Sequence, residues 1–411
     1  MSGDLEIAKQ RFIDTLTISK EIGLQWLVLR TLSMLGDVAR ASGTPREAKQ
    51  WYRQCLSESQ RQENRWGEIL ALHDLGWAAR SLIAYDEAEG YYKESLELSR
   101  TDENRWEMVA VLESLGWLSL FLGNLKPALE RFSEAVSISR ELGMPYRTIP
   151  AQVHIGITWW LLGDFDEAER AIVEIHSTAQ ELNPAGRIFP TICYAEFLAI
   201  SGRYREASGQ LDLLETLTQD LFIDQFTDGR LTRVTGWVAL ALKNYAEAET
   251  QFRRSIELYQ VNSDDEQITW SQAGLACALV GQHRWEAARQ LLVETLWTSI
   301  EMRAFIPLVF SLPMVVLYLA HEAPDQAAQV YAQIQNDPFI ANAPLFEDIV
   351  YQYLPKDIRM KSGPDEGQLP KDHEILWSTA AGVLSNWIQV WVKEPEFITP
   401  QAEENRGDIL D

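Results

Sequence analysis

The hydrophobic pattern of the chain repeats after 40 residues. Three stretches align without a gap: LSMLGDVARASGTPREAKQWY (32–52), LHDLGWAARSLIAYDEAEGYY (72–92) and LESLGWLSLFLGNLKPALERF (112–132). Each contains two runs in which apolar residues recur at i, i+3, i+4 and i+7, and a short turn separates the runs. This spacing places the apolar side chains on one face of a helix. We therefore predict tandem hairpins, each made of two amphipathic helices.

The repeat units can be counted from a small residue that precedes a bulky one by four positions. A small residue lets the two helices of a hairpin approach closely, and the bulky residue fills the gap beside them. One hairpin cannot bury this face alone, so stacked neighbours are expected to bury it in a continuous solenoid with a concave and a convex surface. The small residues of the eight units are Ala48, Ala88, Ala128, Ala168, Ala207, Ala248, Ala287 and Ala327.

A second small position, usually glycine, lies 12 or 13 residues before each of the first seven alanines, as Gly36 does in the first unit and Gly274 in the seventh. Seven residues further on, a glycine often ends the first helix of the hairpin. Glycine suits this place because, without a Cβ, it adopts the left-handed conformation easily. The predicted helix stops of this kind are Gly43, Gly123, Gly163, Gly202 and Gly281.

The two ends of the chain depart from the repeat. Residues 3–22 have the pattern of the second helix of a hairpin whose first helix is missing, so we expect a fragment of a larger protein that starts inside the array. After Ala327 the pattern fades. We predict a repeat array over residues 1–337, an irregular or partly helical linker over 338–371, and a capping helix with an acidic tail over 372–411. An ordinary cap is favoured over a partner-binding helix, and its apolar stripe consists of Leu376, Ala380, Val383, Trp387 and Val390.

An aromatic column lies ten residues before the small position of the first helix. It includes the string ENRW, which occurs at 63–66 and again at 103–106. Its position at the junction between hairpins favours a structural wedge over a ligand contact, and we assign it no function. The column consists of Trp26, Trp66, Trp106, Tyr146 and Phe226.

The overall charge restricts the possible partners. The 36 basic and 60 acidic residues give a net charge of −24, which repels a phosphate backbone and argues against nucleic acid as a partner. The three cysteines are far apart in sequence and match no metal-ligand spacing, which fits a reducing compartment. No apolar run approaches the roughly 18 residues that span a bilayer, and the N-terminus lacks a signal pattern. We predict a cytoplasmic protein without a membrane partner.

No catalytic motif occurs in the chain. GxxxxGK[ST], GxGxxG, HExxH, CxxC and GxSxG are all missing, so phosphate loops, zinc sites and nucleophile elbows have no support. The six histidines are scattered and lack the carboxylate or cysteine neighbours that catalysis or metal binding needs. We therefore predict a binding protein that is not an enzyme, with no cofactor and no metal.

The segment LGDVARASGTPREAKQWYRQCLSESQ (35–60), with its siblings at 40-residue spacing, resembles the C-terminal tetratricopeptide-like sensor arrays of bacterial STAND ATPases. That group includes the maltose-regulon activator and the AfsR-type regulators. The resemblance covers residues 3–337 and implies a right-handed superhelical all-α solenoid of about eight TPR-like hairpins. It also implies an upstream nucleotide-binding module in the same polypeptide. The first hypothesis is a ligand- or protein-sensing domain of such an ATPase, and the alternative is a free-standing TPR scaffold or peptide receptor.

The resemblance also places one stripe of each first helix on the concave surface. This stripe lies roughly 100° from the packing stripe, so packing between hairpins does not require bulky side chains there. It nevertheless gathers aromatic residues, together with five arginines against three carboxylates, which favours a protein, peptide or small-molecule effector with anionic groups. Alternatively, the bulky residues only fill a tight superhelix. The predicted groove residues are Trp77, Arg80, Trp117, Phe121, Trp160, Arg230, Arg233 and Trp237.

Overall fold

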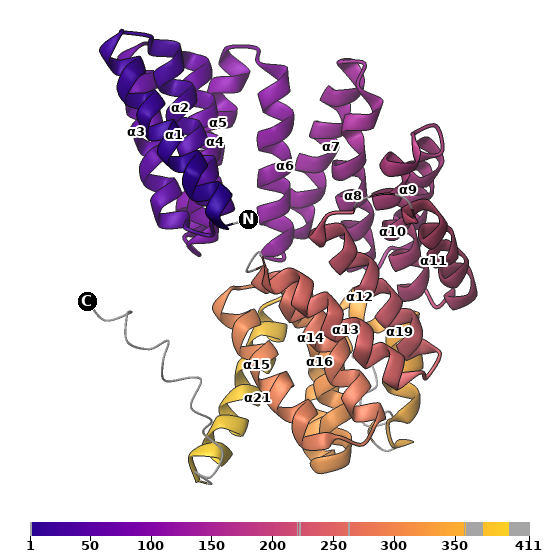
Figure 1. Ribbon diagram of the computed structural model, residues 1–411. Coiled ribbons are helices and arrows are strands. Elements are labelled where there is room, and N and C mark those ends of the chain that lie inside the picture. Colours follow the sequence, from indigo (N-terminus) through magenta and orange to yellow (C-terminus); the bar gives the residue numbers. More distant parts are fainter. Residues whose placement is uncertain are drawn as a thin grey trace.

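A computed structural model describes residues 2–219, 221, 223–261, 264–356, 358 and 373–393 (Figure 1). The described residues form helices and turns and contain no strand, and after the single helix α1 (Ser2–Glu21) eight antiparallel hairpins follow in chain order. The predicted all-α solenoid of about eight hairpins is therefore confirmed. The hairpins are α2 (Gln25–Ala41) with α3 (Pro45–Arg61), α4 (Arg65–Ser81) with α5 (Tyr85–Thr101), α6 (Arg105–Phe121) with α7 (Leu125–Glu141), α8 (Ile149–Leu161) with α9 (Phe165–Ala179), α10 (Pro184–Ile200) with α11 (Tyr204–Thr218), α12 (Gln225–Ala241) with α13 (Tyr245–Gln260), α14 (Asp265–Gly281) with α15 (Trp285–Glu301), and α16 (Phe305–Glu322) with α17 (Pro324–Ile334).

Short elements occupy the joints and the C-terminal region. The 3-10 helix η1 (Pro145–Thr148) leads into α8. After α17, the chain forms two short helices, α18 (Pro338–Asn342) and α19 (Pro344–Ile349), and the 3-10 helix η2 (Tyr351–Tyr353). The final helix is α21 (Glu374–Lys393).

The small-residue columns pack as the sequence predicted. A Cβ on Gly116 would lie 2.7 Å from the ring of Phe132, and Gly76 stands in the same relation to Tyr92. The alanine of the second helix, such as Ala88, is fully buried at this contact. The two helices of a hairpin therefore touch where one of them has no side chain.

The seventh unit differs from the prediction in its register. Its first helix continues through Gly281, and the left-handed residue is His283, with φ 58°. In the second helix the buried small and bulky residues are Ala288 and Leu292, one position later than predicted. The turn requires a positive φ and not glycine as such, so a histidine can occupy it, as Lys243 does in the sixth unit.

The repeated ENRW strings have a different structural role from the one predicted. Asn64 and Asn104 cap α4 and α6, because their side-chain oxygens accept hydrogen bonds from backbone N–H groups three residues later. The indoles of Trp66 and Trp106 are more than half exposed. The expectation of a tryptophan wedge is therefore wrong, since the structural residue of the string is the asparagine.

The C-terminal helix packs on the last hairpins. Helix α21 contacts α15, α16 and α17, and its Leu376, Ala380, Val383 and Trp387 are buried. The side chain of Val390 and the acidic tail lie outside the described residues.

Helix α16 corrects one expectation from the sequence. It is long and apolar enough to span a membrane by length and composition alone, although no such run was expected. Because 78% of that stretch is buried inside the protein, it has the character of a core helix. The cytoplasmic location stays a prediction.

The C-terminal third of the chain folds back against the concave side of the central repeats. Figure 1 shows α14, α15 and α16 below the arc that begins at α6. Helix α16 contacts α6, α18 contacts α8, and α19 contacts α10 and α12. The hydroxyl of Tyr85 donates a hydrogen bond of 2.6 Å to the carbonyl of Met302, which lies 217 residues later. The groove is therefore filled beside the central repeats.

Turn glycines form part of this closure. A Cβ on Gly163 would lie 2.8 Å from both the side chain and the carbonyl oxygen of Pro338, and Gly202 lies similarly close to Pro344. Gly43 has the same positive φ but nothing within 4 Å of its Cβ position. Glycine at 163 thus serves both the turn and the approach of the C-terminal segment.

We expect Gly163→Ala to destabilise the chain more than Gly43→Ala does. Both variants place a Cβ on a left-handed residue, which costs about 1–2 kcal/mol. Only Gly163→Ala also pushes against backbone atoms of Pro338, which adds about 1–3 kcal/mol of overpacking. Denaturant midpoints from far-UV circular dichroism measure the difference. Equal midpoints would contradict the docking of the C-terminal segment at this turn.

Candidate functional site

An open cleft remains between the first helices of the early repeats and the start of α14. We call it the central cleft, and its volume is about 490 Å³, within the usual range of ligand sites. One wall comes from α4 and α6 and the other from the first turns of α12 and α14. The lining residues are Trp77, Arg80, Ser81, Ile83, Tyr85, Trp117, Phe121, Phe226, Asp264, Asp265, Glu266, Gln267 and Met302.

Two further hollows adjoin the central cleft and share Trp117 with it. A hollow of about 330 Å³ lies between α4, α6 and α8 and is lined by Trp77, Arg80, Trp117, His154 and others. A smaller recess of about 70 Å³ leads inward to Arg230 and Arg233. Trp117 therefore stands at the centre of a continuous concave surface.

The first wall presents aromatic faces and the cation of Arg80, which has no ion pair among the described residues. The guanidinium of Arg80 lies 3.9 Å from the ring centroid of Trp117, and Arg40 lies over Trp77 in the same way one repeat earlier, at 5.4 Å. Within the described part of the chain, no carboxylate lies within ion-pair distance of Arg80. Its charge is thus held in place by stacking and is available to a ligand.

The opposite wall is acidic. Asp264 caps α14 by accepting a hydrogen bond of 3.3 Å from the backbone N–H of Gln267. Burial, and then the charge of Asp264, raises the pKa of Glu266 to about 8. Burial also raises the pKa of Asp264 and Asp265 above the usual range. The carboxyl groups of Asp264, Asp265 and Glu266 therefore face Arg80 across the cleft and form no ion pair with it.

The histidines of the adjoining hollow are structural. Burial lowers the pKa of His73 and of His154 to about 4, so both rings are neutral at pH 7. His73 is hydrogen-bonded to the hydroxyl of Ser114 at 2.8 Å, and His154 stacks on Phe132 with ring centroids 5.0 Å apart. Neither ring is poised for proton transfer near neutral pH.

Thiol and metal chemistry find no support in the described residues. The three cysteines are buried free thiols, and burial raises the pKa of Cys193 to about 11, which disfavours the reactive thiolate. Throughout the described ranges, no group of three or more His, Cys, Asp or Glu side chains is placed to hold a metal ion.

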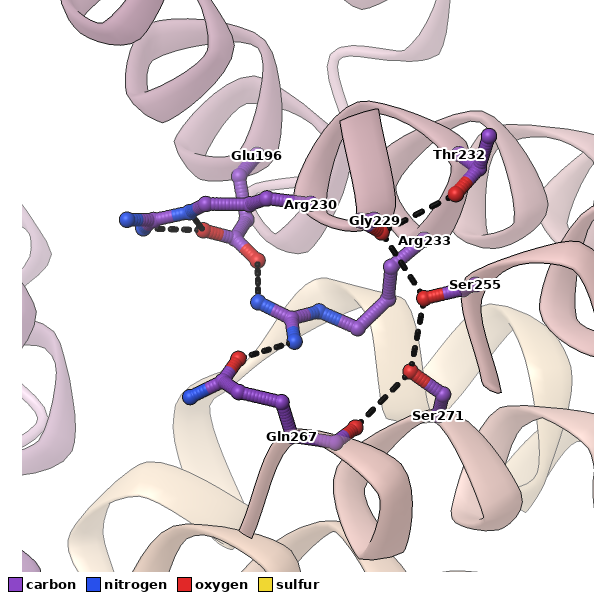
Figure 2. A network of polar contacts seen from close by, with 8 residues as sticks. All are labelled: Glu196, Gly229, Arg230, Thr232, Arg233, Ser255, Gln267 and Ser271. Carbon is purple, nitrogen blue, oxygen red and sulfur yellow. Dashed lines mark hydrogen bonds and ion pairs between the residues drawn. The ribbon is translucent and has the colours of Figure 1, made fainter. Parts of the chain in front are cut away.

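A buried ion network closes the inner end of the recess (Figure 2). Glu196 accepts two hydrogen bonds from Arg230, at 3.0 and 2.5 Å, and one from Arg233 at 3.2 Å. Arg233 also donates to the side chain of Gln267, whose backbone oxygen accepts from Ser271. Burial alone would raise the pKa of Glu196, but the two arginine charges hold it below the usual range. The network joins α10, α12 and α14.

The structure separates the eight predicted groove residues into two sets. Trp77, Arg80, Trp117 and Phe121 line the central cleft, although Phe121 is largely buried. The other set is buried. Whether the cleft residues bind a ligand stays a prediction.

The expectation of an exposed groove is wrong for Trp160 and Trp237, each 1% exposed. The C-terminal third of the chain covers them, since Trp160 stacks on Phe339 of α18 and Trp237 packs against Phe310 of α16. These aromatics are core residues, as the alternative of a filled superhelix required.

The arginines of the inner end also differ from the expectation. Arg230 and Arg233 are buried and reach only the inner recess, not the central cleft. Both are paired with Glu196 and do not offer free charge to an anionic ligand.

Sequence reasoning missed the acidic wall. Asp264, Asp265 and Glu266 read as an ordinary charged helix start, and nothing in the repeat places them opposite Arg80. Phe226 appeared in the aromatic column but received no function. These residues reach the site because the superhelix curls round, and a single sequence carries no signal for that contact.

The comparisons agree with the class of protein that the fold defines, a helical-repeat solenoid of the tetratricopeptide type. Residues 29–61 and 69–101 match two tetratricopeptide repeat models, which cover the first two hairpins. A search of curated proteins finds no match. The chain thus carries tetratricopeptide repeats within a longer array of similar hairpins.

Solved structures support the same fold. A Rap protein complexed with Competence and Sporulation Factor is 12% identical, with a TM-score of 0.55, and the match covers 91% of this chain and 98% of that one. NprR in complex with its cognate peptide NprX is 14% identical over 82% of this chain and 97% of that one, with a TM-score of 0.48. BtubC from P. vanneervenii is 16% identical over 54% and 94%, also with a TM-score of 0.48. At these identities the Rap comparison shows the fold alone, and the other two add no argument.

Proposed function

We propose that the chain binds a peptide or an extended protein segment in the central cleft. The observation that carries this proposal is the open surface around Trp117, with Arg80 stacked on it and unpaired carboxyls opposite. Aromatic and arginine side chains in a pocket are the usual anchors of protein recognition. A polypeptide offers both charges along one chain, which matches the two walls.

The structural likeness is consistent with this function. The Rap protein was solved with Competence and Sporulation Factor bound, on a solenoid of similar length. The all-helical repeat fold is typical of protein-interaction scaffolds. Since Arg230 and Arg233 are engaged with Glu196, Arg80 is the arginine that the central cleft offers to an anionic group of the ligand.

The wider context is a second part of the proposal. The resemblance to STAND sensor arrays suggests that ligand binding biases an attached ATPase, which requires different affinities for its two states. The free-standing peptide receptor is the alternative. In this view, residues 1–337 sense the ligand, and the helix within residues 372–411 caps the array. The gene sequence upstream of Met1 decides between the ATPase sensor and the free-standing receptor. A Walker-type nucleotide-binding module there supports the sensor, and a stop codon contradicts it.

Replacing Trp117 with alanine should abolish peptide binding and leave the helical fold intact. The indole is half-buried at the centre of the cleft, and loss of such an anchor typically costs at least about 2 kcal/mol, roughly thirtyfold in affinity. The measurement is enrichment of peptides from a displayed random library on the full chain, followed by titration of the selected peptides.

Trp106→Ala is the matched control, because this tryptophan is 58% exposed and does not line the cleft. It should keep the binding of the wild-type chain. Peptides that bind the Trp117→Ala and wild-type chains equally well would show that the cleft is not the binding site.

A further inference from the structure

One buried carboxyl group in the cleft has no partner among the residues that the structure describes. Glu266 is 7% exposed and lines both the central cleft and the inner recess. No hydrogen bond or ion pair joins it to another residue of the described chain. By contrast, Glu196 nearby accepts three hydrogen bonds from two arginines. The carboxyl oxygens of Glu266 remain accessible from the cleft, so water or a bound ligand has to supply the hydrogen bonds that the described chain does not.

The surrounding charges leave Glu266 in an acidic corner. On its own helix, Asp264 and Asp265 precede it. From α12, Arg233 turns toward Glu196 and Gln267. From α4, Arg80 faces it across the cleft but stacks on Trp117.

Two further titratable neighbours are Glu301 at the end of α15, whose charge helps to raise the pKa of Asp265, and Tyr85 on α5. The hydroxyl of Tyr85 donates a hydrogen bond to the carbonyl of Met302. Burial raises the pKa of Tyr85 to about 12, so this side chain is neutral. The charge of Arg303, in the turn after α15, acts on Tyr85 and opposes the rise of its pKa. Within the described residues no cation forms an ion pair with Glu266, although the charges of Arg80 and Arg233 act on it and oppose the rise of its pKa.

We propose that Glu266, with Asp264 and Asp265 at the rim, forms a subsite for a basic side chain, lysine or arginine, of the bound peptide. This inference rests on the proposed peptide function and adds the chemistry of one ligand position. An ammonium or guanidinium group supplies the donors and the positive charge that the carboxyl lacks. The same peptide can place an acidic group on Arg80 across the cleft.

The subsite couples binding to pH. Below its pKa of about 8, Glu266 is mostly protonated, so binding of a cation must release that proton. The affinity for a basic peptide should therefore rise with pH up to about 8 and then level off. An interaction with an already ionised carboxylate would show no such rise.

The experiment selects peptides from a displayed random library on the full wild-type chain at pH 8.5. We expect lysine or arginine at one fixed position of the selected peptides. Replacing that residue by norleucine in a synthetic peptide should weaken binding at least about tenfold. Lowering the pH to 6.5 should weaken the binding of the basic peptide about tenfold or more and leave the binding of the norleucine peptide unchanged.

Glu266→Gln provides the test on the protein side, because the amide has the same shape and no charge. It should bind the basic peptide as weakly as wild type binds the norleucine peptide, without further loss when both changes are combined. Glu134→Gln, on the exposed part of α7, is the matched control and should leave binding unchanged.

The outcomes separate the two proposals. Selected peptides without a fixed basic position, or equal binding of the basic and norleucine peptides, would overturn the subsite while the cleft function stands. These readouts need no folded variant. If no peptide is enriched on the wild-type chain, the proposed function fails and the subsite fails with it.

Discussion

Replacing Trp160 with alanine should strongly destabilise the chain, whereas Trp117→Ala should leave its stability near that of wild type. Trp160 is 1% exposed and stacks on Phe339, with ring centroids 5.9 Å apart. Truncating a buried tryptophan typically costs about 3–5 kcal/mol, because the apolar contacts are lost and a cavity remains. This loss would also release the contact between α8 and the C-terminal segment.

Chemical denaturation followed by far-UV circular dichroism measures this difference. Trp117 serves as the control, since it lies on the same predicted concave stripe in the first helix of the previous repeat but remains partly exposed in the cleft. A wild-type midpoint for Trp160→Ala would mean that the groove is open beside α8 and that residues 338–349 do not occupy it. The purely sequence-based view, in which both tryptophans form an exposed groove, predicts that result.

Glu196→Ala should be among the most damaging single substitutions in the chain. It leaves the guanidinium groups of Arg230 and Arg233 buried without their counter-ion. Removing one partner of a buried ion pair typically costs about 3–5 kcal/mol, much more than the pair itself contributes relative to an apolar replacement. The loss should also disturb α14, because Arg233 holds Gln267 beside the central cleft.

An exposed ion pair gives the comparison. Glu134→Ala removes a pair with Arg100, in which both side chains are about 40% exposed, and should cost about 0–1 kcal/mol. The two variants are compared by their denaturant midpoints at pH 7. Similar midpoints would show that the arginines of the network find water or another partner.

The effect of Glu196 also depends on pH, and its sign follows from the pKa. The folded state holds the pKa of Glu196 below its usual value of 4.5, since the arginine charges outweigh the effect of burial. Its contribution to stability is therefore present above pH 4.5 and is lost as the pH falls through the lower, folded value. The difference between wild type and Glu196→Ala should accordingly shrink in acid.

The sequence by itself determined the repeat, the hairpins and the contacts inside them. The fit of Gly76 against Tyr92 is one case, because both residues recur in register after 40 residues and lie in the same hairpin. Contacts of this kind join residues close in sequence, so each unit repeats the same pattern and a single chain shows it several times. Even the deviation in the seventh unit, at His283, stays within the class of fold.

Only the tertiary structure decided which concave residues are free and which are core. Trp117 and Trp237 occupy the same place in their repeats, directly after the small glycine of the first helix, yet the first lines a cleft and the second is buried against Phe310. The curvature of a solenoid is the sum of small rotations between units, and closure brings together residues far apart in sequence, as with Tyr85 and Met302. Such contacts occur once and not periodically, so they leave no pattern along the chain. For the same physical reason, the position of Glu266 opposite Arg80 could be learned only from the folded superhelix.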